Sequence, residues 1–273
     1  MWNKVWKPRF WVSFLSLRIP AGIAEPKEQR ALRIQAVKVL FKWKSKKKTG
    51  ENSRKLITLI NPKSPISEQY RTIRTNIQFS SVDKEIKSIM VTSAGPGEGK
   101  STTASNLAVV FANQEKKVLL VDADLRKPTV HYTFNSSNIT GLTNVLTKKT
   151  SMNSAIAGTN EANLSVLTSG PIPPNPAELL GSLAMKEFLK AAYQEFDIIL
   201  FDTPPVLAVA DAQILANLCD GSILVARSGE TEIDKAKKAN DLIKSAKGKL
   251  LGVVLNHKKL KDSTYYYYGE SDK

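Results

Sequence analysis

The sequence predicts an α/β fold with a doubly wound, mostly parallel sheet and a tail at each end of the chain. Apolar runs of strand length alternate with segments whose apolar residues recur at helical spacing, and this alternation is typical of parallel sheets. Three of the strand runs lead into a glycine-rich turn or into aspartates, at the sheet edge where α/β folds bind ligands. With 273 residues, 42% of them apolar, the chain can bury a substantial core.

The first of these sites is the stretch 93–102, SAGPGEGKST, which follows an apolar run at 89–91 and opens a predicted helix. A strand, a glycine-rich turn and Lys-Ser at a helix start form a P-loop, here with Ala94 at the usual first glycine. Glycine lets backbone N–H groups approach phosphate oxygens, and the helix N-terminus adds donors. Lys100 can reach the β- and γ-phosphates and the Ser101 hydroxyl can bind Mg²⁺. The residues predicted to bind ATP are Gly95, Gly97, Glu98, Gly99, Lys100, Ser101 and Thr102.

Two further strands end in carboxylates. The run 117–121 leads into Asp122 and Asp124, and the run 198–201 leads into Asp202. Four apolar residues followed by aspartate form the Walker B pattern, in which the carboxylate holds Mg²⁺ or its water shell. One carboxylate alone could be a helix cap, but the alternating pair indicates a metal and proton-handling site beside the phosphates. The three elements together, in this order, predict phosphoryl chemistry.

The remaining elements complete the alternation. Helices are expected at 66–79, 141–150, 178–196, 211–219 and 233–247, strands at 164–168, 221–226 and 250–256, and a stiff proline-rich loop at 169–176. Asn256 ends the last strand, where it either reads an adenine base or serves as a turn residue.

The helix at 66–79 has an apolar face and an adjoining charged row. Ile66, Tyr70, Ile73 and Ile77 share the apolar face. Glu68, Arg71 and Arg74 follow one another at steps of three, either as a solvated face with a local ion pair or as a row that pairs with the same row of a neighbouring subunit.

The net charge of +15 belongs to the start of the chain. Residues 1–63 hold 16 Lys and Arg against 3 Asp and Glu, whereas residues 64–273 hold 24 against 22, so nucleic-acid binding is not expected. Residues 31–48 fit a basic amphipathic helix for an anionic membrane surface. The alternatives are a disordered tail or residues upstream of the natural start. The single cysteine, Cys219, allows no internal disulfide and fits a reducing compartment.

The end of the chain carries Tyr265, Tyr266, Tyr267 and Tyr268 in a row. Such a tail is either an aromatic binding segment or a set of phosphate acceptors, and the P-loop favours acceptors. The expected organisation is a poorly ordered leader and linker at 1–63, a P-loop domain at 64–260 and a tyrosine-rich tail at 261–273.

Six segments together resemble the bacterial tyrosine kinases (BY-kinases) of capsule and exopolysaccharide systems, in their single-domain cytosolic form. These are SEQYRTIRTN, SAGPGEGKST, LLVDADLRKP, TSGPIPPNPAELL, FDTPPVLAVADA and the tyrosine cluster, and the resemblance runs from about residue 64 to the end. It implies an ATP-dependent protein-tyrosine kinase that autophosphorylates its tail and regulates polysaccharide synthesis or export. The leader departs from the family pattern.

The resemblance also implies roles for single residues. Lys100, Asp122, Asp124 and Asp202 are the catalytic set, with Asp122 favoured as the base and Asp124 in support. Ser101, Asp122 and Asp202 are the residues implied at Mg²⁺. Glu68, Arg71 and Arg74 match an ExxRxxR interface motif, which implies a homo-oligomeric ring in which each tail enters a neighbour's site.

The implied partners are a transmembrane activator with a cytoplasmic tail, similar to a chain-length regulator, together with a tyrosine phosphatase and protein substrates. The implied location is the cytoplasm, at the inner face of the membrane. The competing interpretation is a MinD/ParA-like membrane- or DNA-associated ATPase switch without kinase activity. Proteins of that class carry a second, signature lysine early in the P-loop, and residues 94–97, AGPG, hold none.

Overall fold

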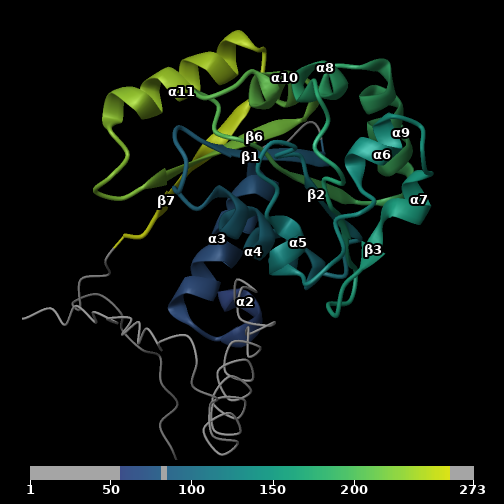
Figure 1. The fold of residues 1–273 in the computed structure, drawn as a ribbon. Helices are drawn as coiled ribbons and strands as arrows, with labels where there is room; N and C mark the ends of the chain where they lie inside the picture. Colours follow the sequence, from purple (N-terminus) through teal and green to yellow (C-terminus); the bar gives the residue numbers. More distant parts are fainter. Residues whose placement is uncertain (1–55, 81–84, 259–273) are drawn as a thin grey trace, which may run out of the picture. The chain divides into compact units, whose positions relative to one another are not determined.

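The computed structural model describes residues 56–80 and 85–258 (Figure 1), all within the second of the chain's two compact units, Asn52–Lys273. The helix expected at 31–48 and the tyrosines 265–268 lie outside the described residues. Within them no helix is long and apolar enough to cross a membrane.

A seven-stranded sheet forms the centre of the fold, in the order β3-β4-β2-β5-β1-β6-β7. The strands are β1 Ser88–Ser93, β2 Val118–Asp122, β3 Ala157–Gly158, β4 Leu164–Leu167, β5 Ile198–Asp202, β6 Gly221–Arg227 and β7 Leu250–Asn256. Every pairing is parallel except the short β3–β4 pair. The predicted doubly wound, mostly parallel sheet is therefore confirmed.

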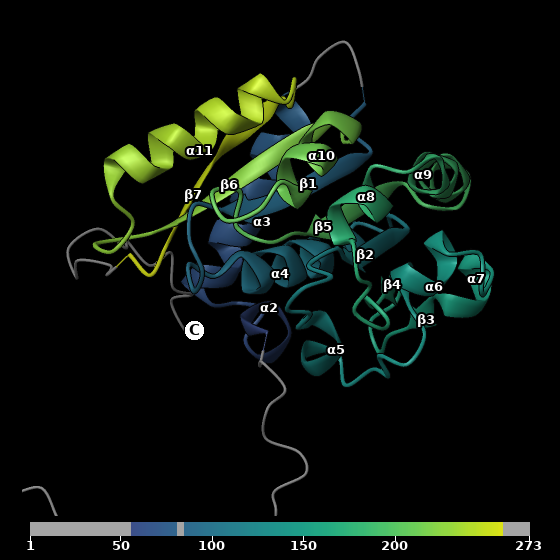
Figure 2. The ribbon, with the colours of Figure 1, turned by 45° about the horizontal axis from the view of Figure 1, so that its top comes forward.

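Helices cover both faces of the sheet (Figure 2). This explains why β1, β2 and β5 are buried throughout and why each contains a run of apolar residues. One face carries α2 Ile57–Ile60, α3 Pro65–Phe79, α4 Lys100–Ala112 and α5 Val130–Thr133. The other carries α6 Leu142–Leu146, α7 Met152–Ala155, α8 Pro176–Leu180, α9 Leu183–Glu195, α10 Asp211–Leu218 and α11 Ile233–Ser245.

The helix that follows the P-loop lies deeper than its sequence suggests. α4 is buried at nearly every position because the sheet lies on one side and α2 and α3 pack on others. Even Asn106 is fully buried, and its Oδ1 accepts hydrogen bonds from the backbone N–H and the hydroxyl of Thr58 at 3.1 and 2.8 Å. Residues 57–60, which belong to the leader and linker expected at 1–63, thus form α2 and pack against α4.

Two further expectations differ from the structure. The single helix expected at 178–196 is two helices, because the chain breaks at Gly181 and restarts at Ser182, whose hydroxyl caps α9 by accepting from the Met185 N–H at 3.3 Å. Ile66 was expected on the buried face of α3 but is 50% exposed. It lies in the first turn and lines an open groove against β7 rather than the core.

The strand register positions the site. Asp122 of β2 is the direct partner of Asp202 of β5, and Val91 of β1 pairs with Asp202 on the other side. Because all three strands run in the same direction, the P-loop after β1 and both carboxylates emerge side by side at one edge of the sheet.

Candidate active site

The P-loop takes a backbone that its glycines permit. Gly97 and Gly99 have φ values of +79° and +98°, in the region that side chains disfavour. A Cβ added to Gly99 would overlap the side-chain amide of Asn256, which donates from Nδ2 to the Glu98 carbonyl at 2.9 Å. The last strand therefore ends against the phosphate-binding turn. Asn256 also accepts the His257 N–H at 2.9 Å, as a turn residue would, and adenine recognition by Asn256 stays a prediction.

The buried side chain of Glu98 stabilises the P-loop turn by a hydrogen bond within the loop. Its carboxylate accepts the Ala94 N–H at 3.1 Å across the loop, and the residue is buried. Ser93 adds a second such hydrogen bond by donating its hydroxyl to the Gly95 carbonyl at 2.7 Å. The side chain of Glu98 thus shapes the loop, and its backbone is what remains available to a phosphate.

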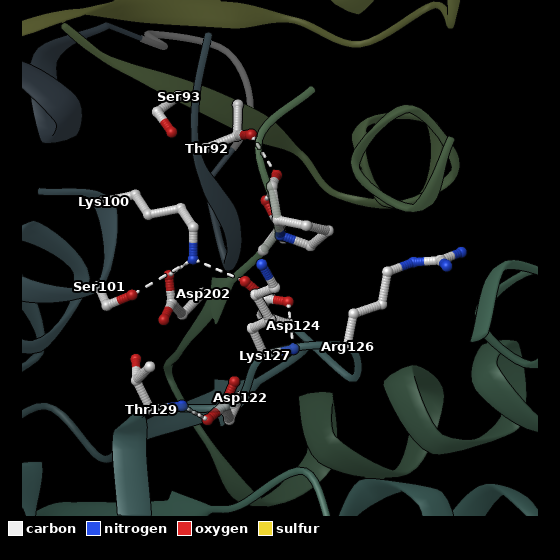
Figure 3. A network of polar contacts seen from close by, with 12 residues as sticks. Thr92, Ser93, Lys100, Ser101, Asp122, Asp124, Arg126, Lys127, Thr129 and Asp202 are labelled. Atoms are coloured by element: carbon white, nitrogen blue, oxygen red, sulfur yellow. Dashed lines mark hydrogen bonds and ion pairs between the residues drawn. The ribbon is translucent and has the colours of Figure 1, made fainter. Parts of the chain in front are cut away.

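Lys100 lies at the centre of the site (Figure 3). Its Nζ is 2.9 Å from Asp124 Oδ2, 3.4 Å from Asp202 Oδ1 and 3.3 Å from the Ser101 hydroxyl oxygen. Burial lowers the pKa of Lys100, but the charges of Asp202 and Asp124 outweigh it and leave the pKa raised. The lysine is therefore charged and neutralises the carboxylates around it.

Asp122 is held by the backbone that follows it. One oxygen, Oδ2, accepts the N–H groups of Thr129 and Val130, both at 2.9 Å. Burial, together with the neighbouring charge of Asp202, raises the pKa of Asp122 to about 8, against the effect of these two hydrogen bonds. Burial also raises the pKa of Asp202, against the charge of Lys100.

The donor set fits Mg²⁺ bound together with a nucleotide. Asp122 Oδ1 and Asp202 Oδ2 are buried without a hydrogen-bond partner among the described residues, and Ser101 lies beside Lys100. No group of three or more His, Cys, Asp or Glu that could hold a metal occurs in residues 56–80 and 85–258. Mg²⁺ in nucleotide sites takes few protein ligands and completes its shell with phosphates and water, which matches this arrangement.

The structure thus brings the four predicted catalytic residues together: Lys100, Asp122, Asp124 and Asp202. Sequence reasoning missed the backbone donors that orient the carboxylates, namely the N–H groups of Thr129 and Val130 on Asp122, and of Lys127 on Asp124 at 3.0 Å. A backbone donor has no side-chain signature. The available signal is Pro128, which interrupts regular structure and predicts a turn here.

The three residues of the predicted interface row have different surroundings on α3. Glu68 and Arg71 form an exposed ion pair with each other. Arg74 instead donates from Nη1 to the Val110 carbonyl at 2.7 Å, in the last turn of α4. Arg74 therefore caps its own P-loop helix, and a subunit contact through the row stays a prediction.

Comparison with known proteins agrees with this site. A family model described as "ParA: NUBPL iron-transfer P-loop NTPase" matches residues 85–265. The tyrosine-protein kinase YwqD of Bacillus subtilis (strain 168) is 60% identical over 228 residues, which cover 83% of this chain and 96% of that protein. The putative tyrosine-protein kinase CapB of Staphylococcus aureus is 43% identical over 211 residues, which cover 77% of this chain and 92% of that protein.

A solved structure of a tyrosine kinase domain is also similar to this chain. The kinase domain of the Escherichia coli tyrosine kinase ETK matches with a TM-score of 0.74 and 34% identity, covering 82% of this chain and 88% of that chain. The ParA match reflects the P-loop fold, whereas the similarity to tyrosine-protein kinases favours the kinase over the MinD/ParA-like switch. The chain belongs to the bacterial tyrosine-protein kinases, the BY-kinase family, in its single-domain form.

Proposed function

We propose that this chain transfers the γ-phosphoryl group of ATP to tyrosine, first to Tyr265–Tyr268 of its own tail, and thereby regulates polysaccharide synthesis or export. The observation that carries the proposal is the placement of Asp122 and Asp124 beside the phosphate-binding Lys100. The kinship with tyrosine-protein kinases supports tyrosine as the acceptor, and the sequence supplies four tyrosines close to its end.

Nucleotide binding is assigned to the P-loop. Its backbone N–H groups and Lys100 would bind the phosphates, and Ser101 and Asp202, with Asp122 adjacent, would hold Mg²⁺. When bound, Mg²⁺ supplies positive charge to the phosphate oxygens as the leaving group departs. Lys100 exchanges its contacts with Asp124 and Asp202 for phosphate, which frees both carboxylates.

Asp122 is assigned as the base. Transfer to a phenol with a pKa of about 10 benefits from a carboxylate that accepts the proton as the bond to phosphorus forms. The two backbone donors fix Asp122 Oδ2, so Oδ1 is left to take the proton from the tyrosine hydroxyl. Burial raises the pKa of Asp122, so that its ionised carboxylate is a stronger base than an exposed one. Asp124 supports the site from the Lys100 side.

The partners follow from the family resemblance. A homo-oligomeric ring would present each tail to a neighbour's site, and the exposed pair Glu68 and Arg71 on α3 is the part of the interface row available for it. Recruitment to the inner face of the membrane by the cytoplasmic tail of a transmembrane activator completes the proposal, with a tyrosine phosphatase and protein substrates as further partners.

Mass spectrometry of the C-terminal peptide, after incubation with ATP, Mg²⁺ and an activator tail, tests the function. Phosphate on Tyr265–Tyr268 that disappears in Lys100→Met and Asp122→Asn is the expected result. ATP hydrolysis that leaves every tyrosine unmodified would identify the chain as a nucleotide switch and refute the kinase.

A further inference from the structure

The turn between β2 and α5, residues 123–129, orients the carboxylates of Asp122 and Asp124. Its backbone supplies the Lys127 N–H to Asp124 Oδ1, and at its end the Thr129 and Val130 N–H groups reach Asp122 Oδ2. A carboxylate held by backbone donors can turn only if the backbone turns with it. The conformation of this turn therefore sets the direction of both groups (Figure 3).

Arg126, in the middle of the turn, is clamped to a buried carboxylate from another part of the chain. Its Nε donates to Asp211 Oδ2 at 2.9 Å and its Nη2 to Asp211 Oδ1 at 3.0 Å, a two-pronged contact. Asp211 is fully buried at the start of α10, and the Arg126 side chain is 41% exposed. Since a buried carboxylate is costly without a counter-charge, the pair holds Arg126 in one place.

The position of Asp211 is itself tied to the P-loop strand. Residues 203–206, which follow β5, lie along β1, and α10 itself contacts β1. Three hydrogen bonds fix these residues there: Thr203 N–H to the Val91 carbonyl at 3.1 Å, Val206 N–H to the Ser93 carbonyl at 2.9 Å, and the Thr92 hydroxyl to the Pro204 carbonyl at 2.8 Å. The clamp thus connects the turn that orients the carboxylates to the strand that carries the phosphate-binding loop.

We propose that Arg126, held by Asp211, is a positioning residue that keeps Asp122 and Asp124 aligned with the nucleotide phosphates. The inference rests on the proposed kinase function. Arg126 acts through the turn and not on the reacting atoms. Because the phosphate-binding N–H groups come from a different segment, losing the clamp lowers the rate of transfer and spares nucleotide affinity.

The test compares Arg126→Met, Arg126→Lys and Asp211→Asn with the wild type in the full chain with its activator tail. Tail phosphorylation gives kcat and the KM for ATP, binding of a fluorescent ATP analogue gives the Kd, and hydrogen exchange follows the amides of residues 123–130. Lys148→Met is the matched control, since it removes an exposed ion pair with Glu187 at 3.7 Å.

A misalignment on the order of 1 Å lowers a rate about 100-fold, so we expect kcat to fall by about 10- to 100-fold in Arg126→Met and Asp211→Asn. The Kd should stay within about threefold, and the amides of the turn should exchange faster. Arg126→Lys, which keeps the charge but not the two-pronged geometry, should fall between Arg126→Met and the wild type. Lys148→Met should match the wild type in every measurement.

Two results would overturn the inference: a wild-type kcat in Arg126→Met, or a joint fall of kcat and nucleotide affinity with faster exchange across the whole domain. The conservative variants Arg126→Lys and Asp211→Asn decide the question if Arg126→Met does not fold. If the wild type itself phosphorylates no tyrosine, the proposed function fails. In that case the hydrogen exchange of residues 123–130 still tests whether the pair of Arg126 and Asp211 holds the turn. Faster exchange in the variants would support this role, and unchanged exchange would refute it.

Discussion

Replacing Gly99 by alanine perturbs the P-loop in two separable ways. The φ of +98° is unfavourable for any side chain and costs about 2 kcal/mol, and the added Cβ would overlap the Asn256 amide. Relieving that overlap displaces Asn256 from the Glu98 carbonyl, at a further cost of about 1 kcal/mol for the lost hydrogen bond. Gly99→Ala should therefore lower the free energy of unfolding by about 3 kcal/mol in all.

A double-mutant cycle with Asn256→Ala separates the two terms. Only the Cβ of Asn256, 3.9 Å from the added atom, survives in that variant, so the overlap disappears while the backbone strain remains. Gly99→Ala should then cost about 2 kcal/mol, which gives a coupling energy of about 1 kcal/mol in urea unfolding of the nucleotide-free protein followed by circular dichroism.

Gly97 provides the matched control. Its φ of +79° is also unfavourable, but a Cβ there meets no atom within 4 Å. Gly97→Ala should cost the same with and without Asn256. A coupling energy near zero for Gly99, or an equal coupling for both glycines, would refute the contact between the end of β7 and the P-loop. The same result would also remove the structural support for placing Asn256 beside a bound nucleotide.

Three other measurements examine the charges of the site and its neighbouring helix. The pKa of Asp122, raised to about 8 by burial, means that the folded protein binds more protons than the unfolded chain between about pH 4 and 8. Stability of the nucleotide-free protein should therefore fall as the pH rises through this window, and Asp122→Asn should flatten the pH dependence of Tm. ATP binding without Mg²⁺ should take up protons in calorimetry at pH 7, because Lys100 leaves buried carboxylates behind; equal uptake with Mg²⁺ present would contradict this. Arg74→Ala should destabilise the fold by about 1 kcal/mol through the lost cap on α4, whereas Arg71→Ala, which breaks an exposed pair, should change stability by under about 0.5 kcal/mol.

The sequence was enough to predict the sheet and to predict that its site residues meet at one edge. Strand-length apolar runs that end in Asp122 and Asp202 can be recognised locally, and parallel pairing then brings their ends together. The break at Gly181 was missed because a helical pattern continues on both sides of it, and the cap at Ser182 becomes visible only with its Met185 partner. α2 was missed because four residues are too few for a periodic signal.

The interactions between distant segments could not be predicted. Arg74 belongs to a regular charged row, yet its partner is a backbone carbonyl 36 residues away. The clamp between Arg126 and Asp211 joins two segments whose neighbourhood depends on the fold. Local periodicity reports which face of an element is apolar, and it carries no information on which distant element covers the polar side.

The same register that builds the sheet also creates its electrostatic difficulty. Pairing β2 with β5 places Asp122 and Asp202 side by side in a buried position. Burial raises the pKa of both carboxyl groups, and the charge of Asp202 raises the pKa of Asp122 further. Lys100 reduces the cost of charging these carboxylates only while it remains between Asp124 and Asp202. A nucleotide that draws Lys100 onto its phosphates must therefore be accompanied by positive charge or by protons at the carboxylates. Phosphate binding and carboxylate neutralisation are thus coupled through one lysine, which explains why the nucleotide and its Mg²⁺ should bind as a unit.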